Sequence, residues 1–238
     1  MKKLAIVIAV VALIAGLLLY VGSQLNSIVA GLIEDHGSAA TQTPVRVAGV
    51  AIELSEASGT ISGLTVGNPE GFSGNAIEMG NFSLSLDPSS LTEDVIVIEN
   101  ILVSGARLNI VQQANGNNLQ ELLRNLDVGT GDSGNDDGAG KKLIINQFTL
   151  EDASASLTAP DLGDVREVNL PTITVRDIGR SSNGATGAEV AKQVLQPVFN
   201  QALESAAVQA IKDKASEKLD EVKDAVLEGI FGSGEEPE

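Results

Sequence analysis

Apolar residues follow three different patterns in succession along the chain. Residues 4–21 form an unbroken run of aliphatic and small residues plus one tyrosine, without a charge. Between residues 44 and 180, apolar and polar residues alternate, and Gly, Pro, Asn, Asp and Ser interrupt the alternation at short intervals. From residue 187 the apolar spacing changes to three and four. The three periods predict an apolar helix, a set of β-strands and an amphipathic helix.

The apolar run near the N-terminus predicts a transmembrane helix. Its 18 residues at about 1.5 Å each approach the thickness of a bilayer's hydrocarbon core. Lys2 and Lys3 precede the run, while Glu34 and Asp35 follow it, which favours a cytoplasmic N-terminus with the remainder outside. A cleaved signal peptide is the alternative, but the run is longer than is usual for one. We therefore expect an anchor and interfacial helix over residues 1–36 that crosses the membrane once.

Residues 44–180 are expected to fold as a mainly antiparallel β-sheet. Residues 95–98 are apolar at every position, which is typical of a central strand covered on both faces. Asn118 is the predicted N-cap of a short leucine-rich helix near residues 117–126. The stretch 127–140 is acidic and rich in Gly, and this composition predicts a flexible insert.

One predicted strand carries the apolar face that we select as the candidate site. Its members are Ile77, Met79, Phe82, Leu84 and Leu86. The apolar positions change from odd to even at Gly80, and a β-bulge there would return all five side chains to one face. This face has two interpretations: the ordinary core beneath a helix, which every sheet needs, or the lining of a groove that shields acyl chains.

Residues 187–231 predict a long C-terminal amphipathic helix, followed by a tail at 232–238. Pro197 is expected to kink this helix or to begin a second one. The segment is rich in Asp and Glu, whereas anionic membrane surfaces attract basic helices. Packing against the β-domain, or pairing with a partner helix, is therefore the favoured interpretation of its apolar stripe.

Composition removes several classes of function. The chain has 32 acidic and 15 basic residues and a net charge of −17, so a basic footprint for nucleic acid is excluded. It has no Cys and a single His, His36, which leaves no thiolate nucleophile and no residues for a histidine-based zinc site. Asp132, Asp136 and Asp137 do not have the spacing of a calcium loop. We predict no catalytic residues, no metal and no cofactor.

Several segments, taken in order, resemble the AsmA-like family of envelope proteins. They are the apolar N-terminal segment followed by Leu25-Asn26-Ser27-Ile28, the strand that begins at Pro44, the turn Asn68-Pro69-Glu70-Gly71-Phe72, and Asn117-Asn118-Leu119 after an apolar strand. The resemblance implies a cytoplasmic-membrane anchor, a periplasmic sheet curled into a groove, and a role in lipid transport or in outer-membrane and envelope biogenesis. It supplies no catalytic residues.

Two functions follow as hypotheses. The first is lipid handling or envelope assembly without catalysis, with membrane lipids as partners. The second is a structural or interaction protein of the envelope that recruits a partner protein through its acidic C-terminal helix. An open apolar groove would favour the first, and a sheet face filled by residues 187–231 would favour the second. The sequence leaves the lipid, the partner and the oligomeric state open.

Overall fold

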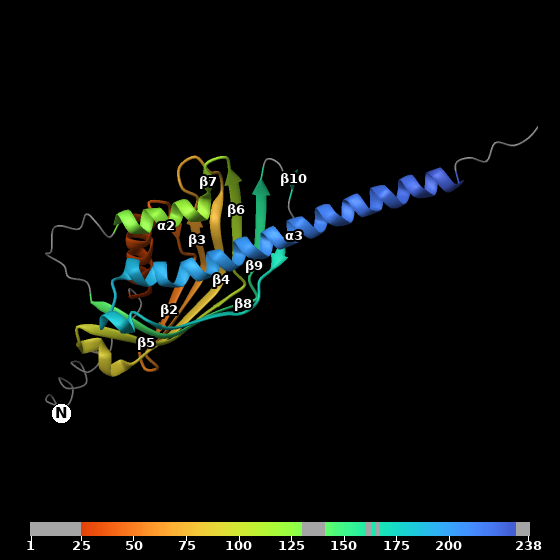
Figure 1. Ribbon diagram of the computed structural model, residues 1–238. Helices are drawn as coiled ribbons and strands as arrows, with labels where there is room; N and C mark the ends of the chain where they lie inside the picture. The colour runs from red at the N-terminus through yellow and green to blue at the C-terminus, as the bar shows by residue number, and fades with distance from the viewer. Residues whose placement is uncertain (1–24, 130–140, 160–162, 165–166, 232–238) are drawn as a thin grey trace, which may run out of the picture.

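The computed structural model describes residues 25–129, 141–159, 163–164 and 167–231 (Figure 1). Among these, no helix is both long enough and apolar enough to cross a bilayer. This finding contradicts the predicted transmembrane helix and the single-pass inner-membrane placement that depended on it. The helix at residues 25–41 is short and carries Glu34 and Asp35, and the helix at residues 187–231 carries charged side chains along its length. The predicted span, residues 4–21, lies outside the described residues.

The described N-terminal helix (residues 25–41) protects an edge of the sheet. Its side chains accept hydrogen bonds from backbone N–H groups of the first strands: Ser38 from Val45 at 2.9 Å, Glu34 from Val47 at 2.8 Å and Asn26 from Ile52 at 3.2 Å. An edge strand with free N–H groups invites pairing with other chains. The helix therefore continues beyond residue 36 and replaces the missing strand neighbour.

The sheet consists of long strands. Several of these are interrupted once, and the two parts of an interrupted strand carry separate labels. The strands are β1 (Val45–Arg46), β2 (Gly49–Glu53), β3 (Ser58–Gly67), β4 (Asn75–Leu86), β5 (Val95–Ser104), β6 (Arg107–Gln113), β8 (Lys142–Glu151), β9 (Ser154–Ala159), β11 (Val168–Asn169) and β12 (Ile173–Ile178). Short pieces β7 (Gly116–Asn117) and β10 (Gly163–Asp164) pair with β6 and β9. Neighbours pair in the order β1/β2, β3, β4, β5/β6, β8/β9, β11/β12.

The interrupted strands keep one register on both sides of each break. β5 and β6 align with β8 and β9 throughout, because Val95 faces Lys142 and Arg107 faces Ser154 with the same offset. Counting from the paired residues places one row across the whole sheet: Ala48, Gly63, Gly80, Gly105, Asp152 and Pro171. We call these six residues the bend row.

The bend row gives the sheet its curvature. Gly63, Gly105 and Asp152 have positive φ angles of 61°, 68° and 50°, a conformation that Gly adopts freely and that Asp tolerates better than most residues. Because neighbouring strands turn at the same row, the sheet bends without losing its pairing. Figure 1 shows the result, with β6 and β9 running in a different direction from β5 and β8.

Two expectations about the sheet need correction. The junction between β5/β6 and β8/β9 is parallel, so the sheet is mixed. The chain between β6 and β8, which includes helix α2 (Asn118–Gly129), crosses back to the end of the sheet at which β5 begins, and β8 therefore runs in the same direction as β5. Residues 95–98 do form part of a central strand, but Val95, Ile96 and Val97 are only half-buried. Helices α2 and α3 (Gly187–Phe231) both pack on one face of the sheet (Figure 1).

Helix α2 is confirmed, but its capping residue is Asn117. The Asn117 side chain accepts a hydrogen bond from the Gln120 N–H at 2.9 Å, which is the N-cap arrangement. Asn118 is fully buried and joins distant segments instead. Its carboxamide oxygen accepts from the Val111 N–H at 2.8 Å, and its nitrogen donates to Asn68 Oδ1 and to the Asn109 carbonyl at 2.6 and 2.7 Å.

Helix α3 is continuous over the predicted residues and is not divided at Pro197. Its first half packs on the sheet and on α2, and the side chains that it buries there are Val190, Val194, Val198, Phe199, Ala202, Ala206 and Ala210. Its second half runs away from the body (Figure 1). The acidic insert from residue 130 to 140 lies outside the described residues, and residues 127–129 complete α2.

Candidate apolar ligand site

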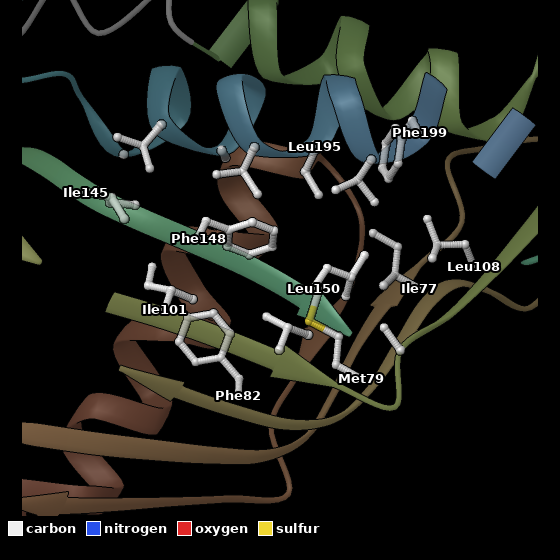
Figure 2. Close-up of a pocket in the computed structure, with 17 residues that line it drawn as sticks. Ile77, Met79, Phe82, Ile101, Leu108, Ile145, Phe148, Leu150, Leu195 and Phe199 are labelled. Carbon is white, nitrogen blue, oxygen red and sulfur yellow. The ribbon is translucent and has the colours of Figure 1, made fainter. Parts of the chain in front are cut away.

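A cavity of about 260 Å³ lies between the bent sheet and the first half of α3. Figure 2 shows Leu195 and Phe199 on α3 pointing toward Phe148 and Leu150 on β8. All the residues around the cavity are aliphatic, aromatic, Met or Gly. A cavity with such walls has no partner for water and favours hydrocarbon, as an engineered apolar cavity of about 150 Å³ stays dry and binds benzene.

The five residues of the predicted face belong to one apolar cluster. Ile77, Met79 and Phe82 line the cavity, while Leu84 and Leu86 continue along β4 and pack against the core. The change from odd to even positions at Gly80 is therefore compatible with a single face. The predicted β-bulge is wrong, because β3 stays in register: its Ser62 faces Asn81 and its Leu64 faces Met79.

The close approach of two strands explains why position 80 is glycine. A side chain there would place Cβ 3.2 Å from the Ser104 carbonyl oxygen and 3.5 Å from that of Gly105. The bend row therefore brings the backbones of β4 and β5 together beside the cavity. This packing positions Met79 and Phe82, which lie on either side of Gly80, against the same space.

Most of the cavity wall was not selected from the sequence. The additional lining residues from the sheet are Ile101, Val103, Ala106, Leu108, Ile145, Phe148 and Leu150. The alternation within each strand identifies these as core positions, but it does not indicate which strands share one concave surface. On α3, the large lining residues are Val190, Val194, Leu195, Val198 and Phe199.

The start of α3 is fixed above the cavity by a capping box. The Thr186 N–H donates to Glu189 Oε2 at 2.8 Å, the Thr186 hydroxyl lies 3.1 Å from the same oxygen, and the Glu189 N–H donates to Thr186 Oγ1 at 3.3 Å. The Thr186 backbone bond and then its hydroxyl bond lower the pKa of Glu189 below the usual glutamate value. The adjoining Gly187 and Val190 line the cavity, so this cap fixes the position at which the helix begins beside it.

The partly exposed lining residues mark the side on which the cavity is least covered. Most lining residues are buried, but Met79 and Phe82 on β4 and Ala191 and Leu195 on α3 are only half-buried, and Gly187 at the start of α3 is exposed. The half-buried Leu84 and Leu86 extend from this side along β4. Leu84 and Leu86 therefore continue the apolar face of β4 away from the cavity.

The cavity contains no group that performs acid–base or nucleophilic chemistry, since no lining residue is ionisable. The other carboxylate with a lowered pKa is Asp87, which accepts hydrogen bonds from the hydroxyl and N–H of Ser89 at the start of a short helical turn (Pro88–Thr92). Both shifted carboxylates thus cap helices. His36 is exposed on the N-terminal helix, and no group of metal-ligating side chains occurs in the described part of the chain.

Comparison with known proteins adds no relative. No protein-family model matches the chain, and no curated protein or solved structure matches it either.

Proposed function

We propose that this protein binds an apolar ligand, such as the acyl chain of a lipid, in the cavity between α3 and the bent sheet, and that it does so without catalysis. The observation that carries this proposal is the wholly apolar wall of a cavity of about 260 Å³. Each methylene group that leaves water for such a wall gains about 0.8 kcal/mol. The resemblance to AsmA-like proteins supports the same class of ligand.

The bend row and α3 together support binding rather than simple core formation. A sheet face covered by a close-fitting helix would leave few voids larger than a water molecule. Here the helix covers the face but the space beneath it remains, with its less covered side along Met79 and Leu195. The covered face also favours the second candidate, a structural protein, for which the cavity would be only a packing defect.

Binding of a polyene fatty acid, whose fluorescence rises in apolar surroundings, separates the two functions. The full chain is expected to bind the probe saturably. Ala191→Phe places a ring in the cavity from α3 and is expected to weaken binding at least tenfold, about 1.4 kcal/mol. Because the ring fills an existing space, the variant should unfold at a denaturant concentration no lower than that of the wild type.

Gln196→Phe is the matched control, since it adds the same ring at an exposed position of the same helix. It is expected to bind the fatty acid like the wild type. Absence of saturable binding by the wild type, or equal binding by Ala191→Phe, would contradict the proposal and leave the structural role. Native mass spectrometry of the purified chain provides an independent observation, because a co-purified lipid should be displaced by the fatty acid.

A further inference from the structure

The second half of α3 is exposed over the part whose side chains the structure describes beyond residue 213. Side chains from residue 214 to 223 are all exposed, and the helix extends past the body there (Figure 1). Isolated helices are marginally stable in water unless something packs on them. A long helical extension that carries large apolar side chains therefore needs an explanation beyond the fold itself.

Those apolar side chains form one stripe, which we call the distal stripe: Val208, Ile211, Ala215, Leu219 and Val222. The four large members are exposed by 44%, 69%, 56% and 59%. Successive members are three, four, four and three residues apart, which at about 100° per residue keeps them within one narrow sector of the helix.

The distal stripe points away from the body. At about 100° per residue, Ala206, which is buried against the body, lies on the side of the helix opposite the centre of the stripe. A surface that contacts the stripe would therefore not collide with the sheet.

Charged residues are sorted by sign around this helix. Lys212 and Lys223 flank the stripe on one side, and Lys214 and Lys218 flank it on the other. The acids Asp213, Glu217 and Asp220 occupy the opposite side of the helix, although Glu221 lies beside Lys214 and Asp220 forms an ion pair with Lys223 at 3.3 Å. The acid-rich composition alone disfavours a lipid surface, but the arrangement favours one, because lysines beside the apolar stripe reach phosphate groups while the acids face water.

We propose that the distal stripe docks on a phospholipid surface, with its apolar side chains among the acyl chains and its lysines at the phosphates. The alternative partner for the distal stripe is a second copy of the chain, which would present the same apolar stripe. Pairing two copies through this stripe would place lysines on both sides of the seam against lysines of the partner, and such like-charge contacts oppose association. This proposal does not depend on a ligand in the cavity.

Tryptophan substitution provides a local test, because the chain contains no Trp. Leu219→Trp places the only indole in the distal stripe, and Glu217→Trp places it on the acidic side of the same exposed helix. With vesicles of phosphatidylcholine and phosphatidylglycerol, the emission of Leu219→Trp is expected to shift to the blue. The emission of Glu217→Trp should stay that of an indole in water, even if another part of the chain binds the vesicles.

The lysines are tested in the Leu219→Trp background. Lys218→Gln is expected to lower the apparent vesicle affinity about fivefold, in line with the attraction of one lysine to an anionic surface. Glu217→Gln, which changes a charge on the far side, should not lower it. No blue shift with vesicles, or equal shifts at positions 219 and 217, would overturn the proposal. A blue shift that grows with protein concentration in the absence of lipid would overturn it in favour of a second copy.

Discussion

At the scale of single residues, Asn118 holds together parts of the chain that are distant in sequence. Its carboxamide bonds to the Val111 N–H, the Asn109 carbonyl and Asn68 Oδ1, and it has no exposed surface. Asn68 belongs to the Asn-Pro turn and Asn118 to the start of α2, so the structure joins two of the segments on which the family resemblance is based. All three polar atoms would lose this partner if the amide were removed.

Asn118→Leu keeps most of the side-chain volume and removes these bonds. It is expected to lower the free energy of unfolding by about 2–4 kcal/mol, because buried polar groups without partners are costly. Chemical denaturation measures the change. Asn115→Leu is the control, since Asn115 is exposed on the preceding turn and the same replacement there should change stability little. Equal losses at the two positions would mean that the buried network contributes nothing specific.

At the scale of elements, the bend row makes a graded prediction for its glycines. Gly63 and Gly105 both have positive φ, so alanine at either position is strained by about 1–2 kcal/mol. At Gly63, however, a Cβ would also lie 2.7 Å from the Ala48 Cβ on the neighbouring strand, whereas nothing lies within 4 Å at Gly105. Gly63→Ala should therefore be more destabilising than Gly105→Ala in thermal or chemical denaturation.

A second measurement on these variants separates bending from stability. If the bend row shapes the cavity, Gly63→Ala should also weaken binding of the fatty-acid probe at temperatures where the variant remains folded. Gly105→Ala, with its backbone strain but no clash, should bind more nearly like the wild type. The reverse order of stabilities would show that contact with Ala48 does not control this part of the sheet.

The sequence predicted the elements better than their arrangement. Periodicity identifies the alternating strand around Ile77 and the helix at 187–231, because both patterns reflect burial of a single face. It does not reveal the bend row, since residues such as Gly63 and Asp152 become neighbours only through pairing across several strands. The parallel junction was missed for a related reason: the stretch after α2 was interpreted as an insert, without regard to the direction in which it returns the chain.

The candidate site shows the same limit more strongly. The face from Ile77 to Leu86 was predicted from its alternation, but a cavity depends on how far α3 stands from the sheet, and no local pattern encodes that distance. The sorting of lysines and acids around the distal part of α3 was present in the sequence. It was missed because the charges were summed over the helix rather than placed around it.

At the scale of the whole molecule, α3 links the cavity to the exposed distal helix. Its first half is attached to the body by side chains such as Val194 and Phe199, while the side chains of residues 214–223 in its second half are exposed. The free energy of local unfolding is therefore expected to decrease along α3 from its packed first half to its exposed second half. Amide hydrogen exchange should be slow for residues 190–206, where the helix is packed, and fast beyond residue 214, where the helix opens without disturbing the core.

A ligand in the cavity should change this profile in one place. Binding to the folded form stabilises the contacts that form the site, by an amount that grows with ligand concentration above the Kd. The fatty-acid probe is therefore expected to slow exchange in residues 190–199 of α3 and in β8, but not in residues 214–223. In Ala191→Phe the probe should leave all of these segments unchanged. Slower exchange confined to the distal segment would place the fatty acid on the exposed helix instead of beneath it, because only contact at that surface protects amides there.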